Sequence, residues 1–212
     1  MPSEPPEKTV LAANLSSRIC HDLVSPVGAI VNGIDLIREI GTTGLDQEFS
    51  MISQSAERAS SLLQFYRLAF GAVGPDSEDI ARDVLLDRAR ALISSPRIVL
   101  DHVGENGPVF ARDDARLLCL MLLCARSLTG MTGAITVRFS PTATFPLRID
   151  ISGAGTAEGP GLMAALDTAA HDAELGPRNI EFALARTCAG ELGVRLGASH
   201  QQGAIMLLAE AA

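Results

Sequence analysis

A histidine and an aspartate stand next to each other early in the chain, and both side chains can take part in group transfer. His21 is followed directly by Asp22. An imidazole is largely uncharged near neutral pH, so one ring nitrogen keeps a lone pair that can attack phosphorus. A neighbouring carboxylate can orient the ring or accept its other proton. These residue types indicate phosphoryl chemistry on His21, with Asp22 in the orienting or basic role.

The direction of His21 follows from the apolar spacing around it. Apolar side chains recur every three or four residues over eight turns: Leu11, Leu15, Ile19, Leu23, Val27, Ile30, Ile34 and Ile37. This spacing is typical of one buried face of a helix. At about 100° per residue, His21 lies about 200° from both Ile19 and Leu23. We therefore expect His21 to point away from the buried stripe and into solvent.

The residues around His21 on the same helix predict a docking surface. Most are small or polar at helical spacing, and Val24 and Val31 lie beside this face as a shallow apolar rim. The predicted docking residues are Arg18, Val24, Ser25, Gly28 and Asn32. The alternative is an ordinary solvated histidine with no role. Pro26 weighs against it, because an interior proline removes a helix hydrogen bond at a cost of about 3 kcal/mol.

A second helix is predicted after the break at Gly41–Gly44. Its apolar residues again recur every three or four positions: Phe49, Ile52, Ala56, Ala59, Leu63, Tyr66 and Phe70. Two long helices joined by a short loop form an antiparallel hairpin. Apolar side chains remain beside the two seams: Val31, Leu36, Leu62, Phe65 and Leu68. Two hairpins pairing into a four-helix bundle would cover them, which predicts a homodimer; alternatively, the C-terminal half covers them within one chain.

The chain divides into three parts by composition and pattern. Residues 1–8 are rich in Pro and Glu and are expected to be disordered, residues 9–73 form the hairpin, and residues 77–212 form a second domain. The second domain is predicted to hold helices at 80–93, 113–129, 162–167 and 178–192, and strands at 97–103, 134–140, 146–152, 194–199 and 204–209. Helices with a mixed or antiparallel sheet make an α+β sandwich.

Charge and apolar run length exclude several classes of protein. The net charge of −8 disfavours nucleic acid and anionic membranes as partners, because both select clustered Lys and Arg. The longest apolar run, Leu117–Ala125, has nine residues where a membrane helix needs roughly 20. No signal peptide is visible, so we expect a cytoplasmic protein. Cys20, Cys119, Cys124 and Cys188 form no CxxC pair, which predicts neither a disulfide nor a zinc site.

The residues around His21 also carry a family resemblance. Segment 18–30, RICHDLVSPVGAI, resembles the H-box of two-component histidine kinases, in which an acidic residue follows the phosphoacceptor histidine and a proline stands five positions after it. His21, Asp22 and Pro26 match those positions. Segment 19–37, ICHDLVSPVGAIVNGIDLI, is more similar to the ChpT-type histidine phosphotransferases of alphaproteobacteria. The resemblance covers nearly the whole chain and is more specific in the first helix than in the second half.

This resemblance implies a fold and a set of partners. It implies a dimer whose hairpins form the phosphotransfer bundle, with a degenerate C-terminal domain of the Bergerat type that does not bind ATP. Phosphate would come from the receiver domain of a hybrid kinase and pass to downstream response regulators. We expect no bound cofactor and no metal site, since a receiver domain can bring its own Mg²⁺ to the transferring oxygens.

The residues of the second half fit a lost ATP site. A Bergerat-type site needs Asn residues for Mg²⁺ and phosphates and an Asp in a D-x-G-x-G turn for adenine. Alignment places Leu120 and Cys124 at the Asn positions and Ile151 at the Asp position, with Asp150 one place off on the opposite strand face. The Gly-rich loop 152–161 is weak evidence for a nucleotide by itself.

Three hypotheses follow. The first is a phosphorelay carrier that holds phosphate on His21. The second is a non-catalytic dimeric scaffold that binds receiver domains, and the third is an ATP-dependent histidine kinase. An adjacent His21 and Asp22 favour the first over the second, because a scaffold does not need an exposed imidazole.

Overall fold

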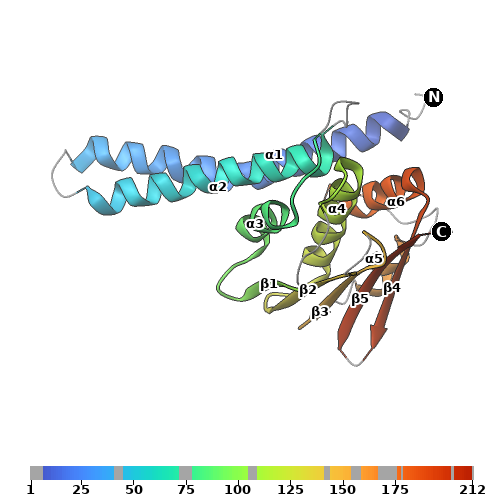
Figure 1. Cartoon of the computed structure of the whole chain (residues 1–212). Helices are drawn as coiled ribbons and strands as arrows, with labels where there is room; N and C mark the ends of the chain where they lie inside the picture. The colour runs from blue at the N-terminus through green and yellow to red at the C-terminus, as the bar shows by residue number, and fades with distance from the viewer. Residues whose placement is uncertain are drawn as a thin grey trace, which may run out of the picture.

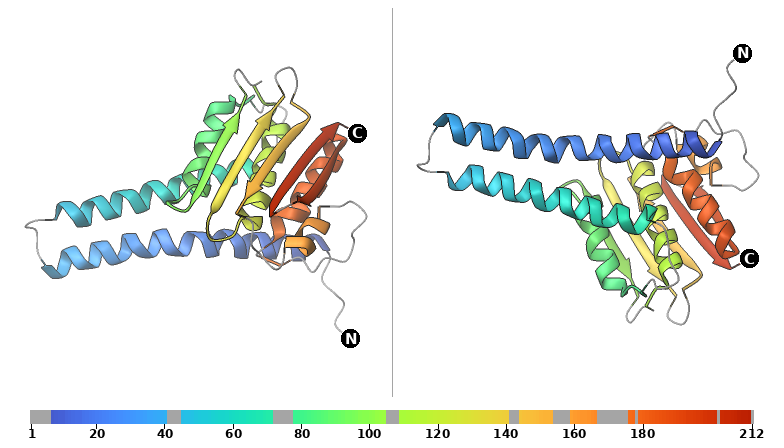
Figure 2. Two further views of the ribbon diagram at one scale, coloured as in Figure 1. Left: turned by 90° about the horizontal axis from the view of Figure 1, so that it is seen from below. Right: turned by 90° about the horizontal axis from the view of Figure 1, so that it is seen from above.

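The protein has two parts, a long helical hairpin and a sheet covered on one face by helices (Figure 1). A computed structural model describes residues 7–40, 45–71, 78–104, 109–140, 144–153, 159–166, 176–177, 179–201 and 203–211. The two parts are packed together at one end of the hairpin, and the other end of the hairpin projects beyond the sheet (Figure 2). The predicted α+β class is confirmed.

The hairpin consists of α1 (Glu7–Ile40) and α2 (Asp46–Phe70), which lie antiparallel and side by side (Figure 2). α1 begins at Glu7, so the last two residues of the predicted disordered tail are helical, and residues 1–6 lie outside the described residues. The predicted break between the helices and the start of the second domain also fall outside the described residues, at 41–44 and 72–77.

The contact between α1 and α2 uses smaller residues than the apolar stripe predicted. Pro26 and Gly33 of α1 are buried, whereas Val27 and Ile34 of the predicted stripe are 48% and 40% exposed. A Cβ atom added to Gly33 would lie 2.6 Å from Cγ1 of Ile52, so glycine allows α2 to approach closely there. The prediction assigned the buried face to the larger aliphatic residues, but within the single chain these two stay exposed beside the contact with α2.

The second part is a mixed five-stranded sheet with helices between its strands. Its elements are α3 (Arg82–Ile93), β1 (Ile98–Val103), α4 (Arg112–Leu128), β2 (Gly133–Phe139), β3 (Leu147–Ser152), α5 (Gly159–Ala164), α6 (Ile180–Leu192), β4 (Val194–Gln201) and β5 (Ala204–Ala211). The strand order is β1-β2-β3-β5-β4, with β1 and β2 parallel and the other pairs antiparallel. α5 starts at Gly159, earlier than predicted, with Pro160 in its first turn, where a missing N–H is tolerated.

Helices α3, α4 and α6 cover one face of this sheet (Figure 1). The strands alternate accordingly: Ile135, Val137, Ile149, Ile151 and Leu207 point into the core and are 0% exposed. α4 is the central helix, and its segment from Leu117 to Ala125 is buried throughout. The nine-residue apolar run is therefore part of a core helix. Among the described helices, none has the length and hydropathy needed to cross a membrane.

The core continues from the sheet domain into the hairpin. Phe65 and Leu68 of α2 are 0% and 1% exposed and belong to the same buried cluster as Leu117 of α4 and Phe182 of α6. The C-terminal half thus covers part of the surplus apolar surface of the hairpin. It leaves Val31 of α1 uncovered, with 51% of this residue exposed.

Candidate functional site

His21 lies on the outward side of α1 with 81% of its side chain exposed. Leu15, Ile19 and Leu23 of the same helix pack against the core. The imidazole therefore faces solvent while the apolar residues on either side of it in sequence face the protein. This is the direction that the helical spacing predicted.

Asp22 receives three hydrogen bonds, one of which comes from His21. Oδ1 of Asp22 lies 3.0 Å from Nδ1 of His21, and Oδ2 accepts a hydrogen bond of 2.8 Å from Nε of Arg18. The hydroxyl of Tyr66, on α2, also donates to Oδ2. Both carboxylate oxygens are thus fixed by donors from two helices, and the oxygen nearer the histidine is directed at its ring.

These contacts determine which nitrogen of His21 is free. Burial by itself would raise the pKa of Asp22, but the hydrogen bonds from Tyr66 and His21 and the charge of Arg18 outweigh burial and hold this pKa below its usual value. Asp22 is therefore a carboxylate at neutral pH, and a carboxylate can only accept hydrogen bonds. Nδ1 of His21 must then carry the proton. In the neutral ring this leaves the lone pair on Nε2, the nitrogen further from Asp22.

Tyr66 also belongs to the site, although its spacing in the sequence predicted only an apolar residue of the helix seam. It is 4% exposed, and its ring lies 5.0 Å from that of Phe70, centroid to centroid. Burial, together with the hydrogen bond to the Asp22 carboxylate, raises the pKa of Tyr66. Tyr66 therefore stays protonated and acts as a permanent donor to Asp22.

Arg18 connects the site to the sheet domain. Besides Asp22, its guanidinium meets Glu181 of α6, with Nη1 at 3.6 Å from Oε2. The Arg18 side chain is only 20% exposed. We predicted Arg18 as a docking residue, but its side chain is directed at these two carboxylates, and Glu181 was not foreseen.

The other predicted docking residues lie on the open side of α1. Ser25 and Asn32 are exposed, and Val24 is 70% exposed. Gly28 is partly exposed, and a Cβ atom added there would meet no atom within 4 Å. The small residues near His21 therefore leave open space, which is what the docking prediction requires.

Comparison with known proteins identifies the family. The model of the histidine phosphotransferase C-terminal domain matches residues 85–204, more than half of the chain. The chain belongs to this family. It is also 35% identical over 145 residues to the protein phosphotransferase ChpT of Brucella abortus (strain 2308), a match that spans 64% of each protein. A solved structure described as a bacterial phosphotransferase superposes with a TM-score of 0.72 at 27% identity, covering 99% of this chain and all of the other.

The three residues that the sequence alignment set at the positions of an ATP site lie in the core of this domain. Leu120, Cys124 and Ile151 are all 0% exposed and lie in the core. Asp150 points to the other face of the sheet, as the strand alternation predicted, and binds Nε of Arg138 and Nε of Arg148 at 2.6 Å each. The first three side chains are thus enclosed by the core, and the carboxylate of Asp150 is paired with two arginines. Most of the Gly-rich loop, residues 154–158, lies outside the described residues.

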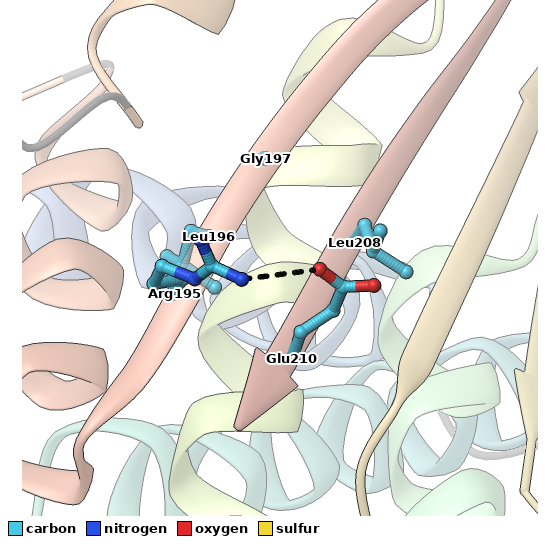
Figure 3. A pocket seen from close by; sticks show the side chains of 5 residues that line it. All are labelled: Arg195, Leu196, Gly197, Leu208 and Glu210. Atoms are coloured by element: carbon cyan, nitrogen blue, oxygen red, sulfur yellow. Dashed lines mark ion pairs between the residues drawn. The ribbon is translucent and has the colours of Figure 1, made fainter. Parts of the chain in front are cut away.

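A shallow hollow of about 230 Å³ lies at the edge of the histidine phosphotransferase domain, on β4 and β5. Figure 3 shows the ion pair at its rim, in which Nη2 of Arg195 lies 3.9 Å from Oε2 of Glu210. Leu196, Gly197 and Leu208 complete the lining. The hollow contains no residue of the His21 site.

The remaining histidines and cysteines have ordinary environments where they are described. Nδ1 of His102 lies 3.0 Å from Nη2 of Arg90, while His171 lies outside the described residues. Cys119, Cys124 and Cys188 are buried, whereas Cys20 is exposed. Within the described ranges, no three His, Cys, Asp or Glu side chains gather closely enough to hold a metal ion.

Proposed function

We propose that this chain is a phosphorelay histidine phosphotransferase that carries phosphate on His21. It accepts the phosphoryl group from the receiver domain of a hybrid histidine kinase and passes it to the aspartates of downstream response regulators. The observation that carries the proposal is the exposed imidazole with Nδ1 directed at the Asp22 carboxylate. Membership of the histidine phosphotransferase family supports it.

The proposed step is a displacement at phosphorus. Nε2 of His21 attacks the phosphorus atom of a receiver aspartyl phosphate, the new N–P bond forms, and the P–O bond to the aspartate breaks, which releases a carboxylate. Attack through Nε2 leaves a positive charge on the ring with the proton still on Nδ1, and the negative Asp22 carboxylate 3.0 Å away stabilises that charge. Transfer to a response regulator is the same step in reverse, with a second aspartate as the nucleophile.

The proposal assigns the metal ion to the partner. Phosphoryl transfer needs a cation that neutralises charge on the equatorial oxygens. The Mg²⁺ of the receiver domain supplies it, so this chain contributes the nucleophile and its orienting groups. An open surface at His21 is consistent with that division, because the receiver must bring both its aspartate and its ion to the ring.

A transfer assay tests the proposal against the scaffold alternative. Receiver domains of hybrid kinases, labelled with [³²P]acetyl phosphate, would be incubated with the wild-type chain and with His21→Ala. We expect label on the wild type, with the acid lability and base stability of a phosphohistidine, and none on the variant. Receiver binding without label on the wild type would instead support the non-catalytic scaffold.

The docking surface can be tested at Gly28. Replacing Gly28 with Trp fills open space beside the path to His21 and leaves the core untouched. We expect slower transfer from the same labelled receivers with an unchanged melting temperature. Unchanged transfer would remove Gly28 from the docking surface, and Ser25→Ala and Asn32→Ala would test the neighbouring positions in the same way.

The proposal includes a homodimer, supported by an exposed apolar face on the hairpin. The face consists of Val27, Val31 and Ile34 of α1 and Phe49, Ala56 and Leu63 of α2. On each helix these residues lie roughly a quarter turn around the helix axis from the side that contacts the other helix. The direction of this rotation is the same for both helices when each is viewed from its N-terminus. Because the helices are antiparallel, the two sets share one face. A second hairpin packed on it would complete a four-helix bundle and bury these side chains.

The proposal assigns no ATP-dependent activity to the chain. The buried Leu120, Cys124 and Ile151 support this, since none can bind Mg²⁺ or adenine. Titration with the fluorescent analogue TNP-ATP tests it: we expect no saturable binding in the micromolar range. Micromolar affinity would instead favour the histidine kinase alternative.

A further inference from the structure

Glu181 is a buried charge at the junction of the hairpin and the sheet domain. In the part of the chain that the structure describes, it is the only charged residue that is buried, with 1% of its surface exposed. Its Oε1 accepts a hydrogen bond from the hydroxyl of Ser127 on α4, and its Oε2 faces Nη1 of Arg18 on α1 at 3.6 Å. One carboxylate thus joins α6, α4 and the helix that carries His21.

The packing of the helices does not require this carboxylate. A buried ion pair loses hydration on both sides, and an apolar pair of similar size is often equally stable or more stable. Burial raises the pKa of Glu181, with Arg18 and the Ser127 hydroxyl acting against burial, so the local environment tolerates the charge at a cost. A cost of this kind at an interface calls for a role other than cohesion.

The geometry of Arg18 supplies that role. Its Nε donates to Oδ2 of Asp22 at 2.8 Å, while its Nη1 lies 3.6 Å from Glu181. A guanidinium is flat and rigid, so fixing Nη1 also fixes the direction in which the Nε–H points. Without Glu181, the guanidinium would lose its contact with α6, and the long side chain of Arg18 would sample more rotamers. Asp22 would then lose a directed donor and could rotate away from His21.

We propose that Glu181 is a positioning residue for His21. Through Arg18 it fixes the Asp22 carboxylate and thereby holds the imidazole with its proton on Nδ1 and its lone pair on Nε2. The sheet domain thus supports the phosphoacceptor through the contact between Glu181 and Arg18. The part of this inference that concerns transfer rests on the proposed function, whereas the part that concerns the proton on Nδ1 does not.

The test measures the tautomer and the nucleophilicity of His21 without a partner protein. Two-bond ¹H–¹⁵N correlation spectra of the full chain report the fraction of neutral His21 with its proton on Nδ1, with His21→Ala used for assignment. Potassium phosphoramidate measures nucleophilicity: Nε2 attacks phosphorus, the N–P bond to His21 forms, and the protonated nitrogen of the reagent leaves as ammonia. Phosphohistidine is then quantified by intact-mass spectrometry.

The variants are chosen to keep the fold. Glu181→Gln preserves shape and the acceptor for Ser127 but removes the charge that anchors Arg18. Glu191→Gln is the matched control, because Glu191 lies on the same helix, is 64% exposed in its side chain and pairs with Arg116 at 3.9 Å, away from α1. Arg18→Lys keeps the charge and removes the two-point geometry. Melting temperatures of all variants are measured alongside.

We expect the wild type and Glu191→Gln to hold His21 mainly as the Nδ1–H tautomer. In Glu181→Gln we expect a smaller Nδ1–H fraction and about 10-fold slower phosphorylation by phosphoramidate, less than the ~100-fold cost of a full ångström of misplacement. Because both residues act through one path, adding Glu181→Gln to Arg18→Lys should cause little further loss. This non-additivity separates positioning from a general loss of stability.

Three results would overturn the inference. The first is a wild type with its proton mainly on Nε2, and the second is a Glu181→Gln variant with wild-type tautomer and rate. The third is a faster Glu181→Gln variant, which would mean that Glu181 competes with Asp22 for Arg18. Failure of labelled receivers to phosphorylate the wild type would instead contradict the proposed function and leave the tautomer result standing.

Discussion

Tyr66 of α2 donates its hydroxyl hydrogen bond to Oδ2 of Asp22 on α1, 44 residues earlier in the chain. The same oxygen accepts a hydrogen bond from Nε of Arg18, while the other oxygen faces Nδ1 of His21. The second helix of the hairpin therefore contributes a functional group as well as packing. The contacts around Asp22 therefore draw on both helices of the hairpin, and Arg18 also reaches Glu181 of α6.

Replacing Tyr66 with Phe should weaken the site while keeping the aromatic packing against Phe70. The variant removes a donor from a charged acceptor, for which we expect a loss of about 1.5–3 kcal/mol in the free energy of unfolding. The pKa of Asp22 should rise towards its usual value, because the hydrogen bond from Tyr66 is a main cause that lowers it. Urea unfolding and ¹³C-detected carboxylate titration measure the two effects. An unchanged Asp22 titration would contradict the assignment of Tyr66 as a donor.

The two carboxylates that share Arg18 should respond to pH with opposite signs. The pKa of Asp22 is lowered by folding, so its contribution to stability is present above the unfolded value of about 3.9 and is lost as pH falls through the folded value. The pKa of Glu181 is raised, so its contribution is present below its unfolded value and is lost as pH rises through the folded value. Urea unfolding from pH 3 to pH 7 measures both.

The variants Asp22→Asn and Glu181→Gln separate the two contributions. The deficit of Asp22→Asn relative to wild type should be largest at pH 7 and shrink below about pH 4. The stability of the wild type relative to Glu181→Gln should fall as pH rises from about 4.5. If the difference in unfolding free energy between wild type and variant changed with pH in the same direction for both variants, the charge states assigned to Asp22 and Glu181 would be ruled out.

Alanine at Gly33 should destabilise the hairpin, whereas alanine at Gly28 should not. The Cβ of Gly33→Ala would meet Cγ1 of Ile52 at 2.6 Å, so the Ile52 side chain or the helix must shift, at a cost of about 1–3 kcal/mol. Gly28→Ala meets nothing within 4 Å and gains helix propensity, about 0.5–1 kcal/mol in favour of the fold. Thermal melts compare the pair, and equal melting temperatures would argue against the close approach at Gly33.

Introducing a charge on the exposed apolar face should separate the proposed dimer. Leu63 is 51% exposed on that face, and Leu63→Glu would bring two carboxylates into an apolar interface. We expect a shift from dimer to monomer by light scattering with the helical content preserved. Gln64→Glu is the control, since Gln64 is exposed on the polar side of α2 and bonds Ser60. A wild type that is monomeric at high concentration would disprove the dimer.

The sequence predicted the elements and the direction of His21 better than the buried seam between the helices. Helical spacing alone placed His21 opposite Leu23. In the structure His21 is exposed and Leu23 packs against the core. The same reasoning placed Val27 and Ile34 inside, because aliphatic residues are the usual interior residues. Pro26 and Gly33 are buried there instead, since small residues let the helices approach. Spacing patterns do not distinguish a face that meets another helix of the same chain from one that stays open.

The partners of His21 could be predicted only in part. Asp22 follows it in sequence and was recognised, but Tyr66 and Glu181 come close only through the fold. Glu181 did carry a usable signal: it shares a helix face with Leu184, Ala185 and Cys188, all of them apolar. A carboxylate on an apolar face needs a buried partner. Glu181 was nevertheless assigned no role from the sequence.

The shared core of α2 and the sheet domain limits how this protein can be divided or recombined. Phe65 and Leu68 are wrapped by residues from the C-terminal half, so a fragment that stopped after Gly71 would present both to water. Grafting the hairpin onto an unrelated domain would create the same problem and would also remove Glu181. If partners dock as proposed, new partner choice would evolve most easily on the outer surface of α1, where substitutions at exposed residues such as Ser25 or Asn32 disturb no shared packing.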